Sequence, residues 1–197
     1  LRYGDPLPIG KTMEGVYIDD HLILQIFSFA DLKAGPLRDE VIVKASRDAY
    51  ARWNLPRATE KEFNLQLKFA AWGTEVNSHT GQVGVPLSRR QDLALATAKL
   101  LDKGRASASI MRRMHGLFVH PFLHRRELLS VFHRSFALGA DLGGADEKLP
   151  AQIHEDLLGA ALLLPFAQSN IRWPLSETVS CTDATPVKGG GVKAQVS

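Results

Sequence analysis

The sequence contains a single cysteine, Cys181, so it cannot form an internal disulfide, and its cysteine usage gives no sign of secretion. Its longest apolar run, Leu157 to Ala167, is too short to span a bilayer and contains a proline. No signal peptide, internal repeat or low-complexity tract is visible. We therefore expect an intracellular protein, in the cytoplasm or the nucleus, without a membrane partner.

The composition is that of an ordinary folded protein. The chain has 197 residues, 45% hydrophobic and 23% charged, which suffices for one or two domains with a core. The net charge is +3, and the isoelectric point near 9.1 permits a basic face without requiring one. The chain starts at Leu1 rather than Met, and its last residues resemble an interrupted strand. We expect a piece of a longer polypeptide or a broken gene copy, although a trimmed expression product would look the same.

The stretch Tyr17-Ile18-Asp19-Asp20 lies between two apolar-leaning runs, one ending at Val16 and the other extending from Leu22 to Phe29. Val, Tyr and Ile favour a pleated strand and an Asp pair favours a turn, so we expect a hairpin over about residues 14–28. Carboxylates at a hairpin tip form a hard-oxygen site suited to Mg²⁺. The competing interpretation is an ordinary acidic turn, because Asp-Asp pairs are common.

Further elements follow from local patterns. Apolar residues at three-to-four spacing predict a helix over Leu37–Trp53. Strand formers predict strands over Phe69–Val76 and Gln82–Leu87, joined by a turn rich in turn-forming residues at Asn77–Gly81. The predicted fold class is therefore α+β.

A helical block follows these strands. A capping box at Ser88-x-x-Gln91 predicts a helix to Lys103, closed by Gly104. Further helices are expected from Ser107 or Ser109, from Pro121 and from about Pro150. At the C-terminus the pattern predicts a strand over Thr178–Ala184, a turn through Pro186 to Gly190, and another strand.

Three of these stretches carry a resemblance to reverse transcriptases. Residues Glu14 to Leu24 look like the Y-x-D-D hairpin of that family, and Ala71–Val76 looks like its primer-grip hairpin. Val179–Val192 is similar to the opening of a ribonuclease H-like domain. The resemblance implies a partial polymerase palm in residues 1–87, a helical thumb or connection in 88–170, and the truncated start of a ribonuclease H-like domain in 171–197.

The resemblance also implies an activity for the parent protein. It would be a retroelement (retrotransposon) RNA-directed DNA polymerase, a nucleotidyltransferase with two Mg²⁺ ions that acts on an RNA template, a DNA primer and dNTP. Asp19 and Asp20 would be catalytic metal ligands, and Asp183 would be a metal ligand of the ribonuclease H-like part. In the family, another catalytic Asp comes from an earlier strand, which cannot fit within residues 1–13. We therefore expect this fragment to be inactive alone and to have no ribonuclease activity.

The resemblance assigns roles to further residues, each with an alternative. Tyr17 would pack beneath the primer end, which is compatible with an ordinary strand aromatic. Lys61 would protonate the leaving pyrophosphate as a general acid, but a solvated loop lysine is the favoured interpretation, and Lys68 is an equal match. Trp72 and Gly73 would position the primer strand, which is compatible with a core tryptophan at a strand bend.

The helical block is rich in basic side chains. Positive helices bind phosphates without reading sequence, which predicts nucleic-acid contacts, while a solvated helix face is the alternative. The residues assigned to this role are Arg112, Arg113, Arg125 and Arg126. Four histidines in the block do not match common zinc spacings, so we expect partly buried or phosphate-facing side chains instead. They are His115, His120, His124 and His133.

Two rival interpretations stay open. The first is a non-catalytic nucleic-acid-binding remnant of a retroelement, which would keep the basic helices without polymerising. The second is a structural helical domain in which Tyr17–Asp20 matches by coincidence. The choice of His21, where Leu or Ile often follows the Asp pair in the family, is a point against the resemblance. Oligomeric state and template preference are not indicated by any pattern.

Overall fold

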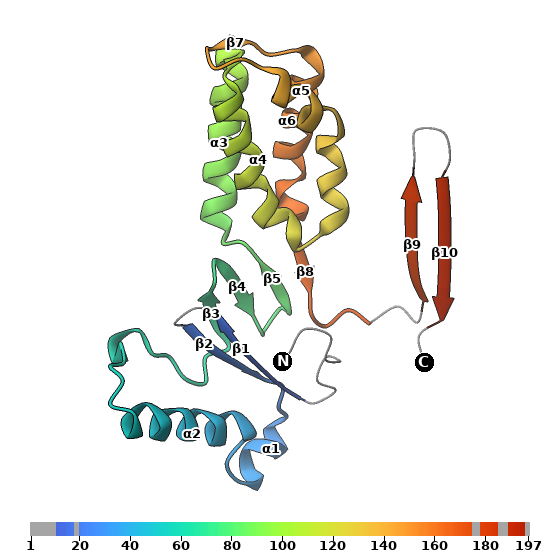
Figure 1. The fold of residues 1–197 in the computed structure, drawn as a ribbon. Coiled ribbons are helices and arrows are strands. Elements are labelled where there is room, and N and C mark those ends of the chain that lie inside the picture. Colours follow the sequence, from blue (N-terminus) through green and yellow to red (C-terminus); the bar gives the residue numbers. More distant parts are fainter. Residues whose placement is uncertain (1–10, 18–19, 175–177, 185–188, 196–197) are drawn as a thin grey trace. The chain divides into compact units, whose positions relative to one another are not determined.

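The computed structural model of the chain describes residues 11–17, 20–174, 178–184 and 189–195. It confirms the α+β class, because helices are combined with small antiparallel sheets (Figure 1). The chain divides into two units, Leu1–Gln66 and Leu67–Ser197, and each is described by itself. The predicted domain boundaries after residues 87 and 170 stay predictions.

The first unit begins with the predicted hairpin. Strand β1 (Thr12–Tyr17) pairs antiparallel with β2 (Asp20–Gln25), and the register ends with Tyr17 opposite Asp20. Helix α2 (Arg38–Arg52) confirms the predicted amphipathic helix, and the 3₁₀ helix η1 (Thr59–Lys61) follows it.

The sequence patterns missed helix α1 (Phe29–Ala34), which begins directly after the stretch assigned to the hairpin, at the last residue of its apolar run. A capping box holds its first turn. The Ser28 hydroxyl accepts the Asp31 backbone N–H, and the Asp31 carboxylate accepts the Ser28 backbone N–H. The run of strand formers therefore ends earlier than predicted, because local capping competes with the strand.

A four-stranded antiparallel sheet opens the second unit, in the order β3-β4-β5-β8. Its strands are β3 (Lys68–Ala71), β4 (Thr74–Asn77), β5 (Gln82–Gly84) and β8 (Gln168–Asn170). The prediction of one strand over Phe69–Val76 was wrong, because the chain reverses at Trp72 and Gly73 within it. Strand β8 was not predicted; it returns after the helices to pair with β5.

Helices fill the chain between β5 and β8. They are α3 (Leu87–Lys103), α4 (Ala108–Leu123), η2 (Arg126–Phe132), α5 (His133–Asp141), α6 (Ala151–Leu163) and η3 (Leu164–Phe166). Short strands β6 (Arg105–Ala106) and β7 (Glu147–Lys148) pair with each other. The C-terminal strands β9 (Thr178–Ala184) and β10 (Gly189–Gln195) form the predicted hairpin, whose intervening residues 185–188 lie outside the described residues.

Several predicted helix ends are confirmed. Gly104 closes α3 in the left-handed conformation with φ +62°, and the Ser107 hydroxyl caps α4. The predicted capping box at Ser88 was wrong, because α3 begins one residue earlier and Pro86 is its N-cap. The predicted helix start at Pro121 was also wrong. This proline lies inside α4, where its buried ring offsets the loss of one backbone hydrogen bond.

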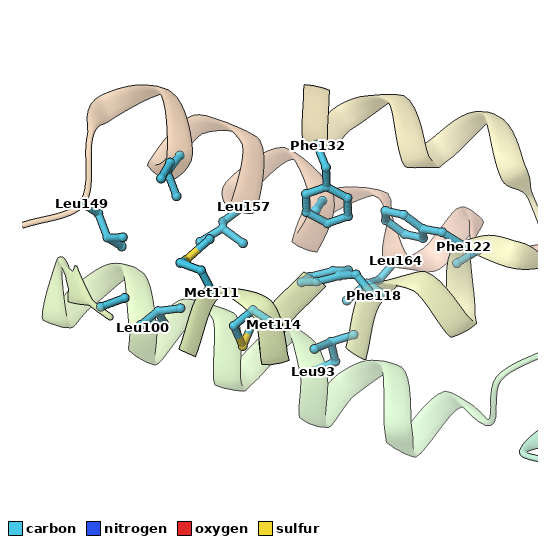
Figure 2. Close-up of a cluster of buried hydrophobic side chains, with 14 residues drawn as sticks. Leu93, Leu100, Met111, Met114, Phe118, Phe122, Phe132, Leu149, Leu157 and Leu164 are labelled. Carbon is cyan, nitrogen blue, oxygen red and sulfur yellow. The ribbon is translucent and has the colours of Figure 1, made fainter. Parts of the chain in front are cut away.

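The hydrophobic core lies among these helices. Phe118 and Phe122 of α4 meet Phe132 of η2, with ring centroids 5.2 to 5.8 Å apart, and all three rings are fully buried (Figure 2). Met111 from α4 and Leu157 from α6 extend the cluster toward the other end of the bundle. Burying side chains of this size contributes about 1.5–3 kcal/mol each.

Candidate metal and nucleic-acid site

The end of the β1–β2 hairpin is the candidate metal site of the first unit. Asp20 opens β2 with an exposed side chain, and Tyr17 closes β1 directly opposite it. Two residues, 18 and 19, connect the strands, and Asp19 lies outside the described residues. Of the predicted Asp pair, the structure therefore describes Asp20. For Tyr17 it describes the backbone pairing alone.

The two faces of the hairpin differ. His21 contacts Glu14 on β1, with Nε2 2.8 Å from Oε1, and Ser46 on α2, with Nδ1 3.3 Å from Oγ. Helix α2 therefore lies against the face that carries His21. Because side chains alternate along a strand, the side chains of Asp20 and Leu22 share one face of the hairpin, and the side chain of His21 lies on the other face. Asp20 consequently lies on the face away from α2.

The Asp20 carboxylate fits a hard cation. Its residue is exposed, and within the described ranges it forms no ion pair or hydrogen bond with a side chain. Mg²⁺ keeps several waters and needs only one or two protein carboxylates. Among the described residues, no three His, Cys, Asp or Glu side chains gather as a metal-holding group. Asp19 and the side chain of Asp183 do not belong to the described part of the chain, so this finding does not cover them.

Two other predicted residues lie elsewhere. Lys61 ends η1 in the first unit with an exposed side chain, and no hydrogen bond or ion pair in the described part of the chain links it to Asp20. Lys68, its competing match, lies in β3, 3.8 Å from the Glu75 carboxylate. Asp183 lies in β9 opposite Gly190 of β10, a residue that the sequence pattern had placed in the turn.

The turn between β3 and β4 is a separate candidate site, which lies in the second unit. Trp72 has φ +52° and Gly73 has φ +74°, a pair of positive values that defines the tight type I′ hairpin turn. A bulky aromatic residue at positive φ is rare and strained. Trp72 remains 42% exposed, so it is a partly buried turn residue and not the core tryptophan of the alternative interpretation.

Two histidines contact this turn, His120 in the last turn of α4 and His124 at its C-cap. A Cβ added to Gly73 would lie 2.9 Å from Cε1 of His120, so a larger residue would require the imidazole to shift, and it would also be strained at φ +74°. His124 contacts the next residue, with Nε2 3.2 Å from the Thr74 hydroxyl. The two imidazole centroids are 5.8 Å apart. Burial lowers the pKa of His124, and the neighbouring His120 lowers it further, so His124 is neutral at pH 7.

The arginines of the helical block fall into two groups. Arg125, one of the predicted nucleic-acid contacts, is paired with Glu127, with Nε 2.9 Å from Oε1. Arg90, Arg105 and Arg134 are likewise engaged by carbonyl or carboxylate oxygens. Among the arginines of the helical block, all of which the structure describes, Arg89, Arg112, Arg113 and Arg126 are exposed and have no hydrogen-bond or ion-pair partner in the described part of the chain.

His115 belongs to the core instead of to a surface site. Its Nε2 lies 3.0 Å from the Ser135 hydroxyl, and its ring packs against Phe132 and Phe136. Burial lowers its pKa, against the opposing effect of the Asp156 charge. Asp156 is itself buried and accepts the backbone N–H groups of Arg134 and Ser135, which caps the first turn of α5.

Comparisons with protein-family models, with curated proteins and with solved structures found no match to this chain. No helix among the described residues is long and apolar enough to cross a membrane.

The sequence patterns did not indicate the residues that contact the Trp72–Gly73 turn. Thr74 and His124 come together because the C-terminal end of α4 lies at the β3–β4 turn, and the chain separates the two residues by 50 positions. A local signal did exist for the surface of α4, because the whole helix lacks acidic residues. The fold separates the four histidines of the block into buried His115, exposed His133, and His120 and His124 at the turn.

Proposed function

We propose that this chain forms part of a retroelement RNA-directed DNA polymerase, contributing a portion of its two-metal nucleotidyl-transfer site and of its surface for an RNA/DNA hybrid. The observation that carries the proposal is the end of the β1–β2 hairpin. There Asp20 presents an exposed carboxylate with no described partner, on the face away from α2.

The order of elements supports the same proposal. The hairpin is followed by a helix, then by a tight strand reversal at Trp72 and Gly73, and then by a helical bundle. This is the order that the resemblance implies for a palm, a primer-contacting hairpin and a thumb. The β9–β10 hairpin corresponds to the proposed start of a ribonuclease H-like domain, with Asp183 on its first strand.

In this proposal, Asp19 and Asp20 hold the metal ions. Two bound Mg²⁺ ions supply activation of the primer 3′-hydroxyl and stabilisation of the triphosphate leaving group. His21 fixes the strand that carries Asp20, because it joins β2 to both β1 and α2. The Trp72–Gly73 turn brings backbone close to the primer strand, since no side chain projects from Gly73.

The last proposed role is that of the general acid, which would protonate the leaving pyrophosphate. Lys61 is the better candidate, because the alternative, Lys68, is already paired with Glu75. Lys61 is exposed and belongs to the same unit as Asp20. A lysine that is free of a carboxylate partner is the more available proton donor.

The test of the hairpin site uses Mn²⁺ as a paramagnetic substitute for Mg²⁺. Titrating the ¹⁵N-labelled chain with Mn²⁺ is expected to broaden the amide signals of His21 and Leu22 first. The Asp20→Asn variant, and Asp19→Asn with it, should lose this selective broadening. Asp48→Asn, which neutralises an exposed carboxylate on α2, is the matched control and should leave it unchanged.

The same experiment separates the proposal from its first rival. A non-catalytic nucleic-acid-binding remnant would bind an RNA/DNA hybrid without any selective Mn²⁺ effect at the hairpin. Broadening that is spread evenly over acidic surfaces, or that survives the Asp20→Asn change, would remove the metal-site proposal.

A further inference from the structure

Two histidines lie one helical turn apart at the C-terminal end of α4. His120 is in the last turn of the helix, and His124 is its C-cap, which keeps helical backbone angles of φ −72° and ψ −14°. Side chains at positions i and i+4 lie on the same side of a helix. The two imidazole centroids are accordingly 5.8 Å apart. We call His120 and His124 the histidine pair.

Pro121 lies between the two histidines, and its place in the fold decides whether they can act together. A helix that began at Pro121, as the sequence pattern predicts, would leave His120 outside that helix. In the structure Pro121 lies inside α4, so the helical register continues from His120 to His124. The proline also removes one backbone hydrogen bond from this part of the helix. The fold therefore places two imidazoles together across a turn that lacks one backbone hydrogen bond.

Contacts from the four-stranded sheet hold His124 in place. Its Nε2 lies 3.2 Å from the Thr74 hydroxyl of β4, and its backbone carbonyl accepts the hydroxyl of Ser169 from β8. The other ring nitrogen of His124, Nδ1, has no hydrogen-bond partner in the described part of the chain. A polar group on one ring nitrogen orients an imidazole in the way that outer-shell groups do at metal sites.

His120 is the exposed member of the histidine pair. Its ring lies over Gly73, with Cε1 2.9 Å from the position that a Cβ of that residue would take. Neither ring nitrogen of His120 has a hydrogen-bond or ion-pair partner among the residues that the structure describes. Each histidine of the pair therefore has a ring nitrogen free to bind a ligand.

The donor atoms of the histidine pair determine the class of ligand. Imidazole nitrogens bind divalent ions such as Zn²⁺, Ni²⁺ and Cu²⁺, whereas Mg²⁺ and Ca²⁺ take oxygen ligands. Two histidines four residues apart on one helix face are a zinc-binding spacing. No third His, Cys, Asp or Glu side chain of the described residues joins the pair. Within that part of the chain the remaining coordination positions are left to water, as in an open zinc site and unlike a closed structural one.

We infer that His120 and His124 form a binding site for a divalent transition-metal ion of the zinc class. Metal binding joins the two residues across Pro121 and so stabilises the last turn of α4. The site lies in the second unit and uses nitrogen donors, so it is separate from the predicted Mg²⁺ ligands of the β1–β2 hairpin. The inference therefore goes beyond the proposed function and does not depend on it.

The first test is a competition titration in which the untagged full chain removes Zn²⁺ from a chromophoric chelator. Excess Mg²⁺ is present to occupy carboxylate sites, and Cys181→Ser is the common background, because a thiolate also binds Zn²⁺. His120→Gln and His124→Gln should each weaken Zn²⁺ binding about a hundredfold, since a second ligand on the same rigid element adds roughly 10²–10⁴ in affinity. His133→Gln, which removes an exposed histidine from α5, is the control and should keep full affinity.

The outcomes of this titration are decisive for the histidine pair. Equal Zn²⁺ affinity in the background protein and in both His120→Gln and His124→Gln would overturn the inference. A loss in His133→Gln as large as in these two variants would also overturn it, because binding would then be spread over surface histidines. Ni²⁺ should depend on the same two residues, and displacement of Zn²⁺ by Mg²⁺ at equal concentration would mean an oxygen site instead.

The second test concerns the link between metal binding and folding. An unfolded chain does not hold the two imidazoles together, so Zn²⁺ should bind the native state preferentially and raise its melting temperature by several degrees. Amide exchange at Phe122 and Leu123, which lie between the ligands, should slow when Zn²⁺ is added.

His120→Gln is the matched variant for this second test. It changes an exposed side chain, so it should fold as the wild type does and show neither effect of Zn²⁺. A Zn²⁺-dependent rise in melting temperature that persists in His120→Gln would contradict the assignment. The Mn²⁺ titration of the β1–β2 hairpin is read at different amides, so either proposal can fail while the other stands.

Discussion

The two units of the chain are stabilised in different ways. Among the described residues of the first unit, Leu37 is the one buried hydrophobic side chain, and large side chains such as Phe29 and Trp53 are 87% and 74% exposed. The second unit has a continuous core that joins α3, α4, η2 and α6. The first unit relies instead on strand pairing, caps and polar contacts such as those of His21.

This difference shows where stability and chemistry lie. A packed core fixes the rotation of α4 and so the position of its exposed face. The hairpin with Asp20 is positioned by hydrogen bonds of modest strength, each contributing about 0.5–1.5 kcal/mol. We therefore expect the helical bundle of the second unit to unfold cooperatively, and the first unit to unfold in a separate transition.

The largest expected effect is in the aromatic core. Phe132→Ala removes a fully buried ring that contacts Phe118 and Phe122, and should lower the free energy of unfolding by about 3–5 kcal/mol. Trp53→Ala in the first unit should change it by less than about 0.5 kcal/mol. Urea unfolding followed by circular dichroism measures both. Similar losses in the two variants would contradict the comparison.

The next effect concerns the buried cap of α5. Asp156→Ala removes the acceptor of two backbone N–H groups and the partner of Arg134, which should cost about 2–4 kcal/mol. Arg134→Gln keeps the cap and should cost clearly less, because that guanidinium is partly exposed. Hydrogen exchange of the α5 amides reports the change directly, and protection that persists in Asp156→Ala would refute the capping role.

The pH dependence of the bundle follows from His115. Its pKa in the folded state is lowered by burial, so protonation favours the unfolded chain. Stability is fully present above the unfolded pKa of about 6.5 and is lost as the pH falls toward the folded value. The melting temperature should drop by about 2–4 °C between pH 7.5 and pH 5.5. His124, whose pKa is lowered in the same direction, contributes with the same sign.

A variant isolates the contribution of His115. His115→Gln retains a hydrogen-bonding group toward Ser135 but does not titrate, so its melting temperature should depend less on pH than that of the wild type. An identical pH profile for the two proteins would show that other groups dominate.

The smallest expected loss of stability is in the first unit. Ser28→Ala removes one half of the α1 capping box and should destabilise that helix by about 0.5–1 kcal/mol. Because α1 buries none of its residues, the bundle should melt at an unchanged temperature. Amide exchange resolved by residue separates the two regions, and a lower melting temperature of the bundle would mean that the units are energetically coupled.

Elements specified by local signals were predictable from the sequence. The apolar spacing of α2, the left-handed Gly104 cap and the Ser107 cap act within one or two turns, and each is confirmed. The β9 and β10 strands were predicted in the same way, from strand formers around a turn.

Elements that depend on distant contacts were not predictable. Strand β8 consists of polar residues, Gln168–Asn170, and exists because β5 pairs with it. The reversal at Trp72 contradicts the strand preference of its neighbours; the packing of His120 over Gly73 accompanies it. For the candidate site, the sequence indicated the hairpin and the arginine-rich helices. It did not indicate which arginines the fold engages, because pairs such as Arg134 with Asp156 join separate helices.

The most direct test of the proposed function is primer extension by the parent polypeptide that the resemblance implies, expressed with its upstream coding sequence. With an RNA template, a DNA primer, dNTP and Mg²⁺, the account predicts extension by the wild type and loss of extension in Asp19→Ala and Asp20→Ala. Arg125→Gln, whose side chain Glu127 engages, should extend the primer normally. Equal extension by the wild type and both aspartate variants would contradict the assignment of this hairpin to the polymerase active site.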